Sequence, residues 1–490
     1  MAEKVAIFEI NLFVIYGVIN DVINGSSTPI DIQSIDIHKC FDEMWYHETH
    51  NDMFDVKVQD DKFSLIAKMD ETAQVVVKTP CGLTDEFTLE KIIMQGSVFG
   101  PIKSTIQIDT LGRDCQSYNK GMFSYKNVLN LTPLALIDDC LGFSRCNADA
   151  VELNAIINSK ISSKKLRLSA AKCNHMHISK TPTSCYNSLK AGSATMKKST
   201  VCSYLGDILS SSGSLDATIE NRRQKGIGLC SQITGMVDGL SLGHFYYKIS
   251  FMFRECKLLN GILTNTEIWY PITNTQIEVL EDIDLMFIRK LVKGHAKTAK
   301  EAFHMETGLL PIRFVCMKRR VMYLHHILSK PTSEMIRRVY EVQKQIYTKN
   351  DWYSLVQDNK NELGIQLSDE EISKMSKERF RSLVQTAIDK RAMVYLNNIA
   401  SSHSKSEDLM KSRLVWEEYF EDKRFSKSEI ELLFALRTRM VPGIKANFSS
   451  QYNNIVTCDL CQTAIDCQEH QLSCGYSRLI QKYRQTVEDS

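Results

Sequence analysis

The sequence lacks both an apolar run long enough to span a membrane and an N-terminal segment of the secretory type. The apolar stretch 6–23 is interrupted by Glu9 and Asp21, and no cleavage-type flank follows it. No run of 18 uncharged apolar residues occurs, so we expect no membrane span. These absences predict an intracellular protein, in the nucleus or the cytoplasm.

The sequence also lacks the cysteine density of a small disulfide scaffold, and no internal repeat is evident. Its 15 cysteines are spread over 490 residues, of which 43% are hydrophobic and 24% charged. Such a composition is ordinary for a folded protein, and the length suggests about three domains. We expect most of the cysteines to be reduced core residues or metal ligands.

A strong excess of one charge is absent from the whole chain, whose formal net charge is +2, but the charges are unevenly distributed. Residues 1–150 carry 12 Lys and Arg against 22 Asp and Glu, whereas residues 286–350 carry 14 against 4. Carboxylates in one place and a basic element elsewhere suit a protein that binds both metal ions and phosphates. The alternative is an ordinary solvated helix surface.

Proline is scarce beyond residue 215, and the pattern from there to about 450 predicts helices. The earlier part mixes helix and strand: a helix is expected before residue 25, and a half-buried strand over Ile30–Ile37. Lys62–Asp70 and Thr72–Thr79 are interpreted as strands of a hairpin, and short apolar strands flank Asp138-Asp139. The expected fold class is therefore α+β.

Three blocks carry the most specific chemistry. Asp36 ends the first strand and begins Asp-x4-Phe, which Phe41 completes; Gln95-Gly96-x3-Gly-Pro follows; and Asp138-Asp139 lies between two apolar strands. Two separated carboxylates that converge on Mg²⁺ are what in-line phosphoryl transfer requires. An isolated Asp-Asp is usually only a turn, and the three blocks are informative only in combination.

In order and content these blocks resemble the palm of a reverse transcriptase of the LINE-type, non-LTR retrotransposon class, and the resemblance covers roughly residues 5–475. It implies an antiparallel palm sheet with helices and an RNA-directed DNA polymerase activity. It also implies two Mg²⁺ ions and three partners: an RNA template, a DNA primer or target, and dNTPs.

The resemblance also implies roles for single residues of the palm. Asp36 and Asp138 would bind the two Mg²⁺ ions, with Asp139 adjacent. Phe41 would be a steric gate under the incoming sugar, although a core aromatic is equally compatible with the sequence. Gln95 and Gly96 would contact the nucleotide and template. Lys103 departs from the small or apolar residue expected after the Gly-Pro.

Further roles concern the leaving group and the nucleic acid. Lys172 falls where the family has a lysine near the leaving pyrophosphate, and it would act as general acid. Tyr204-Leu205-Gly206 resembles the primer-grip hairpin. The densest basic cluster, Lys318-Arg319-Arg320, is expected to contact phosphates from the thumb.

A second motif lies near the end of the sequence. Cys458-x2-Cys461-x8-His470-x3-Cys474 has zinc-ligand types and spacing, and Cys467 is a competing ligand. It resembles the zinc knuckle that follows the polymerase in several LINE-type proteins. The expected structural cofactor is therefore Zn²⁺.

Together these features predict four parts: a palm over 1–212 with partial fingers at most, a helical thumb over 213–345, a helical region over 346–450 and the knuckle over 451–490. Only 35 residues precede Asp36, too few for the basic fingers of a full reverse transcriptase. The alternative function is therefore a truncated, non-catalytic remnant that still binds nucleic acid.

Overall fold

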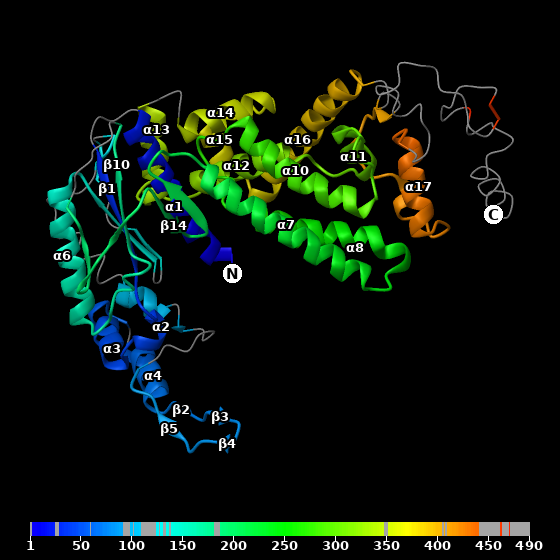
Figure 1. Cartoon of the computed structure of the whole chain (residues 1–490). Coiled ribbons are helices and arrows are strands. Elements are labelled where there is room, and N and C mark those ends of the chain that lie inside the picture. The colour runs from blue at the N-terminus through cyan, green and yellow to red at the C-terminus, as the bar shows by residue number, and fades with distance from the viewer. Residues whose placement is uncertain are drawn as a thin grey trace. The chain divides into compact units, whose positions relative to one another are not determined.

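The computed structural model divides the chain into two compact units (Figure 1). The first comprises Met1–Thr218, Ile268–Ile272 and His326–Gln357, and the second comprises Ile219–Glu267, Thr273–His325 and Asp358–Ser490. The structure describes residues 2–24, 29–58, 60–91, 99–100, 102–108, 124–126, 128–130, 134–136, 139–180, 187–346, 351–403, 406, 409–440, 461–462 and 470.

A five-stranded sheet forms the centre of the first unit. Its order is β13-β10-β1-β9-β8, and β1 pairs antiparallel with both β9 and β10. The strands are β1 (Ile30–Asp36), β8 (Leu134–Leu136), β9 (Asp139–Ser144), β10 (Asn174–Ile178) and β13 (Lys197–Lys198). The predicted strand ending at Asp36 and the predicted hairpin around Asp138-Asp139 are confirmed, with Ile137 and Asp138 themselves outside the described residues.

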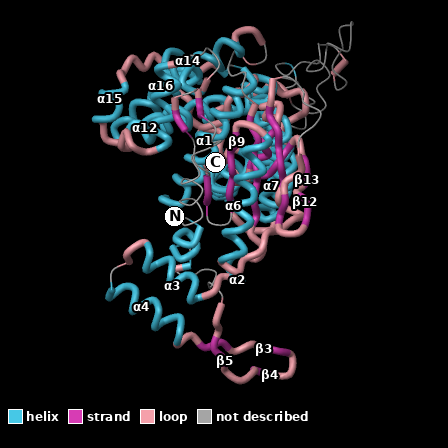
Figure 2. Tube along the Cα trace, turned by 90° about the vertical axis from the view of Figure 1, so that its left-hand side faces the viewer, coloured by secondary structure: helices cyan, strands magenta, loops and turns pink. Residues whose placement is uncertain are grey.

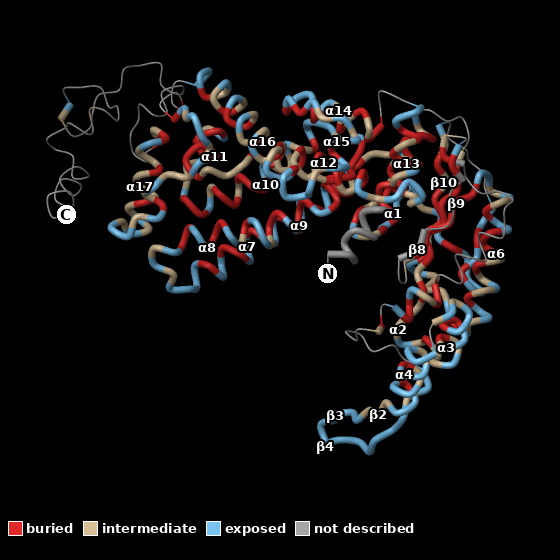
Figure 3. The backbone as a smooth tube through the Cα atoms, turned by 180° about the vertical axis from the view of Figure 1, so that it is seen from behind, coloured by how far each residue is buried: buried red, intermediate tan, exposed pale blue. Residues whose placement is uncertain are grey.

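Two helices lie on opposite sides of this sheet, α1 (Ala2–Asn24) and α6 (Asn147–Ser163) (Figures 1 and 3). Ile35 of β1 packs with Leu153 and Ile157 of α6, while α1 contacts β8 and β10. Because both faces are covered, β1 is buried along nearly its whole length rather than half-buried. The helix expected before residue 25 is confirmed.

Between β1 and β8 the first unit extends into an arm (Figure 2). The arm contains α2 (Cys40–Glu43), α3 (Tyr46–Asp55), α4 (Asp60–Glu71) and a ribbon formed by β2 (Gln74–Val75), β3 (Lys78–Thr79), β4 (Gly82–Leu83) and β5 (Phe87–Thr88). The predicted strand over Lys62–Asp70 is wrong, because these residues form α4. Ile66 and Asp70, one helical turn apart, are its buried side chains.

The rest of the first unit consists of small hairpins and a returning segment. The hairpins are β6 (Ser124–Tyr125) with β7 (Leu129–Asn130), β11 (Lys190–Ala191) with β12 (Ala194–Thr195), and β14 (Val201–Tyr204) with β15 (Asp207–Ser210). Helix α13 (Met335–Gln345) packs against α1. Residues 326–357 thus belong to the first unit although helices of the second unit precede and follow them.

The second unit is helical in its described part, as expected from residue 215 onward. Its helices include α8 (Tyr246–Phe253), α10 (Asn274–Leu291), α11 (Lys300–Thr307), α15 (Asp369–Lys374), α16 (Lys377–Ala400) and α17 (Lys427–Arg437), and α7 (Asp216–Asp238), α12 (Ile312–Leu328) and α14 (Trp352–Glu362) lie partly in it. The chain as a whole is mixed α+β. Within the described ranges, no helix has both the length and the apolar character needed to cross a bilayer.

Candidate active site

Two of the three predicted carboxylates have a described position, and they face each other. Asp36 is the last residue of β1, and in the antiparallel ladder its direct partner is Asp139, the first residue of β9. Directly opposed residues project from the same face of a sheet, with Cβ atoms about 4.5–5.5 Å apart. The Asp36 side chain is 19% exposed, so a ligand can reach it. Asp138 lies outside the described residues.

Lys172 contacts Asp36 of this pair directly. Its Nζ lies 3.2 Å from Oδ2 of Asp36, although the two residues are 136 positions apart. The loop that carries Lys172 is fixed by the backbone: Ser169 N donates to Asp36 O at 2.9 Å, and His38 N donates to Arg167 O at 2.8 Å. The backbone of this loop is therefore fixed beside the end of β1, which places the Lys172 side chain within reach of the carboxylate.

Cys173 supports the other side of Asp36. Its buried thiol lies 3.4 Å from the Asp36 backbone nitrogen and 3.7 Å from the Asp36 carbonyl oxygen. Burial raises the pKa of the Cys173 thiol, so this sulfur remains protonated and serves as packing rather than as a nucleophile.

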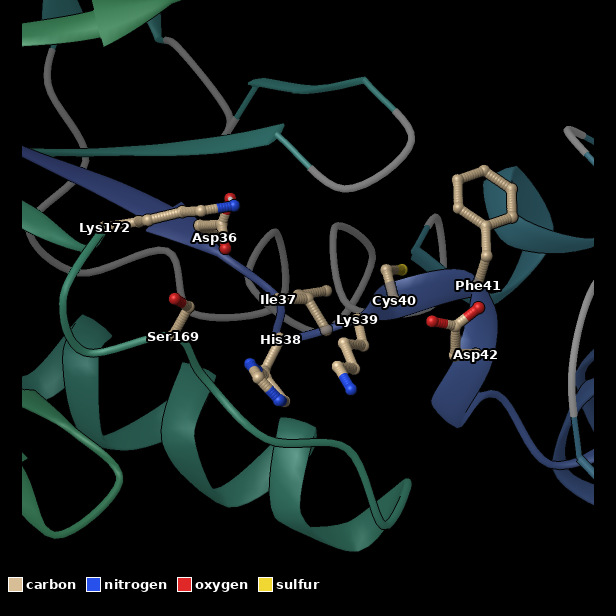
Figure 4. Close-up of a pocket in the computed structure, with 9 residues that line it drawn as sticks. All are labelled: Asp36, Ile37, His38, Lys39, Cys40, Phe41, Asp42, Ser169 and Lys172. Carbon is tan, nitrogen blue, oxygen red and sulfur yellow. Dashed lines mark hydrogen bonds and ion pairs between the residues drawn. The ribbon is translucent and has the colours of Figure 1, made fainter. Parts of the chain in front are cut away.

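A pocket of about 470 Å³ opens beside these groups (Figure 4). It is lined by Asp36, Ile37, His38, Lys39, Cys40, Phe41, Asp42, Ser169 and Lys172. His38 and Lys39 add two basic side chains that the sequence interpretation missed, although both lie inside the Asp-x4-Phe block. The carboxylates of Asp36 and Asp42 and the basic groups of the wall form a surface suited to a metal-bound polyphosphate.

Lys39 adopts an unusual backbone conformation. Its φ is 44° and its ψ is 48°, in the left-handed region that side chains other than glycine rarely occupy. This conformation turns the chain from β1 into α2, and Asp42 N and Glu43 N both donate to Lys39 O. Such strain costs about 1–3 kcal/mol and is often found where a site is built.

Phe41 has two roles. It is half-buried and packs against the core cluster that contains Cys40, Ile35 and Leu153, yet it also lines the pocket. The two interpretations left open by the sequence, a steric gate and a core aromatic, are both compatible with this position. Its use as a gate stays a prediction.

The Gln95-Gly96 pair lies outside the described residues, but the structure explains the unexpected Lys103. This side chain is buried, and its Nζ lies 2.5 and 2.6 Å from the two carboxylate oxygens of Asp70 in α4. His50 of α3 contacts the same carboxylate at 2.9 Å. Burial alone would raise the pKa of Asp70, but the hydrogen bonds from His50 and Lys103 lower it below its ordinary value. Lys103 thus joins helix 102–108 to the arm.

The Tyr204-Leu205-Gly206 hairpin is confirmed and firmly anchored. Leu205 and Gly206 both have positive φ, 48° and 85°, as a two-residue primed turn requires. Asp207, fully buried, accepts hydrogen bonds from Tyr16 of α1 at 2.9 Å and from Trp269 at 2.8 Å. The hairpin is therefore locked to other parts of the first unit, and its contact with a primer stays a prediction.

The basic cluster of α12 is not the free surface that the sequence suggested. Arg320 is 3% exposed and donates to Asn359 Oδ1 at 2.7 Å. Arg319 donates to Leu263 O at 2.5 Å, and Lys318 contacts Gln385. Burial lowers the pKa of Arg320. The expectation that all three contact phosphates does not fit this geometry, because Arg320 belongs to the core of the second unit.

Two of the four proposed zinc ligands have a described position. Cys461 Sγ lies 3.1 Å from His470 Nε2, within hydrogen-bond distance. Two such ligands on one tetrahedral Zn²⁺ would lie about 3.6 Å apart. Cys458 and Cys474 lie outside the described residues. In the part of the chain that the structure describes, no group of three or more His, Cys, Asp or Glu side chains is arranged to hold a metal ion.

The pocket lies in a segment of the chain that matches a known protein family. Residues 24–209 match the model of the family described as reverse transcriptase (RNA-dependent DNA polymerase). All nine pocket residues and Asp139 lie inside this segment. No curated protein sequence matches the chain.

Among solved structures, the chain is similar to two telomerases. Telomerase from Candida tropicalis in complex with a TWJ fragment of telomeric RNA is 11% identical, with a TM-score of 0.37 over 76% of this chain and 52% of that one. The corresponding complex from Candida albicans is 12% identical, with a TM-score of 0.33 over 59% and 51%. This chain thus spans about half the length of these structures. The pocket is thus built by residues 24–209, the segment that matches the reverse transcriptase family.

Proposed function

We propose that this chain is an RNA-directed DNA polymerase of the LINE-type retrotransposon class. The observation that carries the proposal is the ladder position of Asp36 directly opposite Asp139, with the Lys172 ammonium group 3.2 Å from the Asp36 carboxylate. The reaction joins the primer 3′-oxygen to the α-phosphorus of a dNTP, breaks the α–β anhydride bond and releases pyrophosphate. The expected partners are an RNA template, a DNA primer or target, and dNTPs.

Two Mg²⁺ ions would be held by Asp36 and Asp138, with Asp139 adjacent. Carboxylate oxygens at an accessible strand end are the hard ligands that Mg²⁺ prefers. When bound, such ions neutralise phosphate charge and align the attacking and leaving oxygens. Lys172 would donate its proton to the departing pyrophosphate.

The remaining pocket residues would bind the substrate. Lys39 would bring positive charge to the triphosphate, His38 would donate a hydrogen bond to it, and Phe41 would form the wall where a 2′-hydroxyl would clash. Gln95 and Gly96 complete the nucleotide contact, and Tyr204-Leu205-Gly206 supports the primer end. The division into a palm over 1–212, a thumb over 213–345, a helical region over 346–450 and a terminal knuckle belongs to the same proposal.

The C-terminal Zn²⁺ site is a separate part of the proposal. The 3.1 Å approach of Cys461 to His470 supports a shared ion with Cys458 and Cys474. Zinc content of the purified full chain tests it, with about one ion per chain expected and none in Cys461→Ser. Unchanged zinc content in Cys461→Ser would count against the site.

Primer extension on an RNA template tests the polymerase itself. With Mg²⁺ and dNTPs the chain should extend the primer, and Asp36→Asn should lower the rate by on the order of 10²–10³. Asp42→Asn is the matched control, because it removes a carboxylate from the same pocket. The alternative is a remnant that binds nucleic acid without polymerising. Duplex binding with no extension by the unmutated chain would favour it.

A further inference from the structure

The Asp36–Lys172 contact has a consequence beyond catalysis, provided that the proposed function identifies the site. Asp36 and Asp139 face each other across the ladder, and like charges in directly opposed positions destabilise a sheet. The Lys172 ammonium lies 3.2 Å from Asp36 Oδ2, where a positive charge offsets this repulsion. The edge therefore contains its own compensating cation.

The backbone fixes Lys172 while its side chain stays free to move. Ser169 N donates to Asp36 O, and Lys172 N and Cys173 N both donate to Ser169 O at 2.9 and 3.0 Å. This turn anchors the Lys172 backbone at the strand end. The Lys172 side chain is 70% exposed, so its flexible stem can leave Asp36 at little cost.

We propose that Lys172 is an internal counter-cation that holds the Asp36–Asp139 edge together without metal and yields its place when a divalent ion binds. A divalent ion and the ammonium group compete for the same carboxylate oxygen. Once displaced from Asp36, the ammonium group still lines the pocket, and there it can contact the negative charge of an incoming polyphosphate. The pocket is therefore a cation-exchange site.

Titration with Mn²⁺ alone tests this exchange in the full chain, with Asp36→Asn defining the binding that belongs to the site. Lys172→Gln should bind Mn²⁺ about two- to fivefold more tightly, the range expected for losing an exposed ion pair. The same variant should unfold at a lower temperature in chelator, and saturating Mn²⁺ should remove the difference. Lys172→Arg should bind Mn²⁺ more weakly, because a planar guanidinium holds a carboxylate through two bonds.

Lys39→Gln is the matched control, since Lys39 lines the same pocket outside this ion pair. It should change Mn²⁺ affinity less than Lys172→Gln does. Equal or weaker Mn²⁺ binding by Lys172→Gln, or an equal effect of Lys39→Gln, overturns the inference. Primer extension tests the proposed function separately. If the Mn²⁺ results are as expected but the chain does not extend a primer, the polymerase proposal is wrong and the counter-cation proposal stands. If the chain extends a primer but the Mn²⁺ results are not as expected, the counter-cation proposal is wrong and the polymerase proposal stands.

Discussion

The end of β1 and helix α12 are both rich in charged side chains, but these side chains have different kinds of partner. At the end of β1, Asp36, Asp139 and Lys172 come from distant parts of the chain and meet beside an open pocket. On α12, consecutive basic residues separate and contact the protein itself. The charged groups that meet at the end of β1 are thus far apart in sequence, whereas the neighbouring charges of α12 do not share a site.

Backbone geometry explains the difference. In an antiparallel ladder, residues far apart in sequence lie directly opposite each other, so their side chains share a face. On a helix, consecutive residues point in different directions and cannot form one patch. Arg320 therefore points into the core, while Arg319 and Lys318 reach separate neighbours.

A charge count over a window has the same weakness, because it omits partners outside the window. Segment 286–350 is strongly basic, but three of its cations pair with acids of the second unit that lie outside the segment. The pairs are Lys293 with Glu431 at 2.9 Å, Lys300 with Asp282 at 2.7 Å and Arg313 with Glu281 at 2.9 Å. The charge count over this segment therefore omits three acids that pair with its cations.

The largest expected effect tests whether buried cations of the second unit are structural. Arg254 donates to both oxygens of Asp284 at 2.6 Å, and both side chains are at most 1% exposed. Arg254→Met would leave the Asp284 carboxylate buried without its partner, at a cost of about 3–5 kcal/mol in the free energy of unfolding. Urea denaturation measures it, with Arg313→Met as the more exposed comparison. Equal losses in both variants would show that burial does not decide the cost.

A second prediction concerns a buried ion pair in the first unit. The pKa of Asp70 is lowered, since the hydrogen bonds from His50 and Lys103 outweigh burial. A carboxyl whose folded pKa is depressed stabilises the protein above its unfolded pKa, and this stability is lost as pH falls through the folded pKa. Asp70→Asn should therefore cost about 1–3 kcal/mol near pH 7 and progressively less below about pH 4. Thermal unfolding from pH 3 to 7 measures the difference.

Asp61→Asn is the control for that experiment, because Asp61 is exposed at the start of the same helix. It should change stability little at any pH in this range. A constant difference between Asp70→Asn and the unmutated chain from pH 3 to 7 would show that the charge of Asp70 is not what stabilises the arm.

A smaller effect is expected at the pocket wall. If Phe41 excludes a 2′-hydroxyl, Phe41→Val should lower the ratio of kcat/KM for dNTP over rNTP by about tenfold or more. Some stability should also be lost, since Phe41 packs against the core. Ile37→Val, a truncation of a buried side chain on the same pocket, is the control. An unchanged ratio in Phe41→Val with reduced stability would assign Phe41 to the core alone.

The sequence predicted the elements that short-range patterns determine and missed what depends on distant partners. Three elements could be predicted: the strand ending at Asp36, the later hairpin that carries the carboxylates, and the turn at Leu205-Gly206. In each of them the strand residues and the turn residues are neighbours in the sequence. Helix α4 was mistaken for a strand, since a short apolar run does not distinguish the two. The contacts of Lys103 and Arg320 could not be predicted, because their partners Asp70 and Asn359 lie 33 and 39 residues away.

The smallest expected effect is the sharpest test of α12. Each lost phosphate contact lowers the slope of log affinity against log salt by about 0.7–0.9, through counterion release. The triple variant Lys318→Ala/Arg319→Ala/Arg320→Ala should leave that slope for duplex binding unchanged, while reducing stability. The comparison is Lys225→Ala on α7, whose side chain is exposed near Gly228 and Gly235, where nothing lies within 4 Å of an added Cβ. If this open helix face approaches a duplex, Lys225→Ala lowers the slope by about one contact. A lower slope in the triple variant alone would mean that Lys318 and Arg319 leave their internal partners and contact phosphate. Local charge density in the sequence would then predict the phosphate-binding residues better than the contacts of the folded chain do.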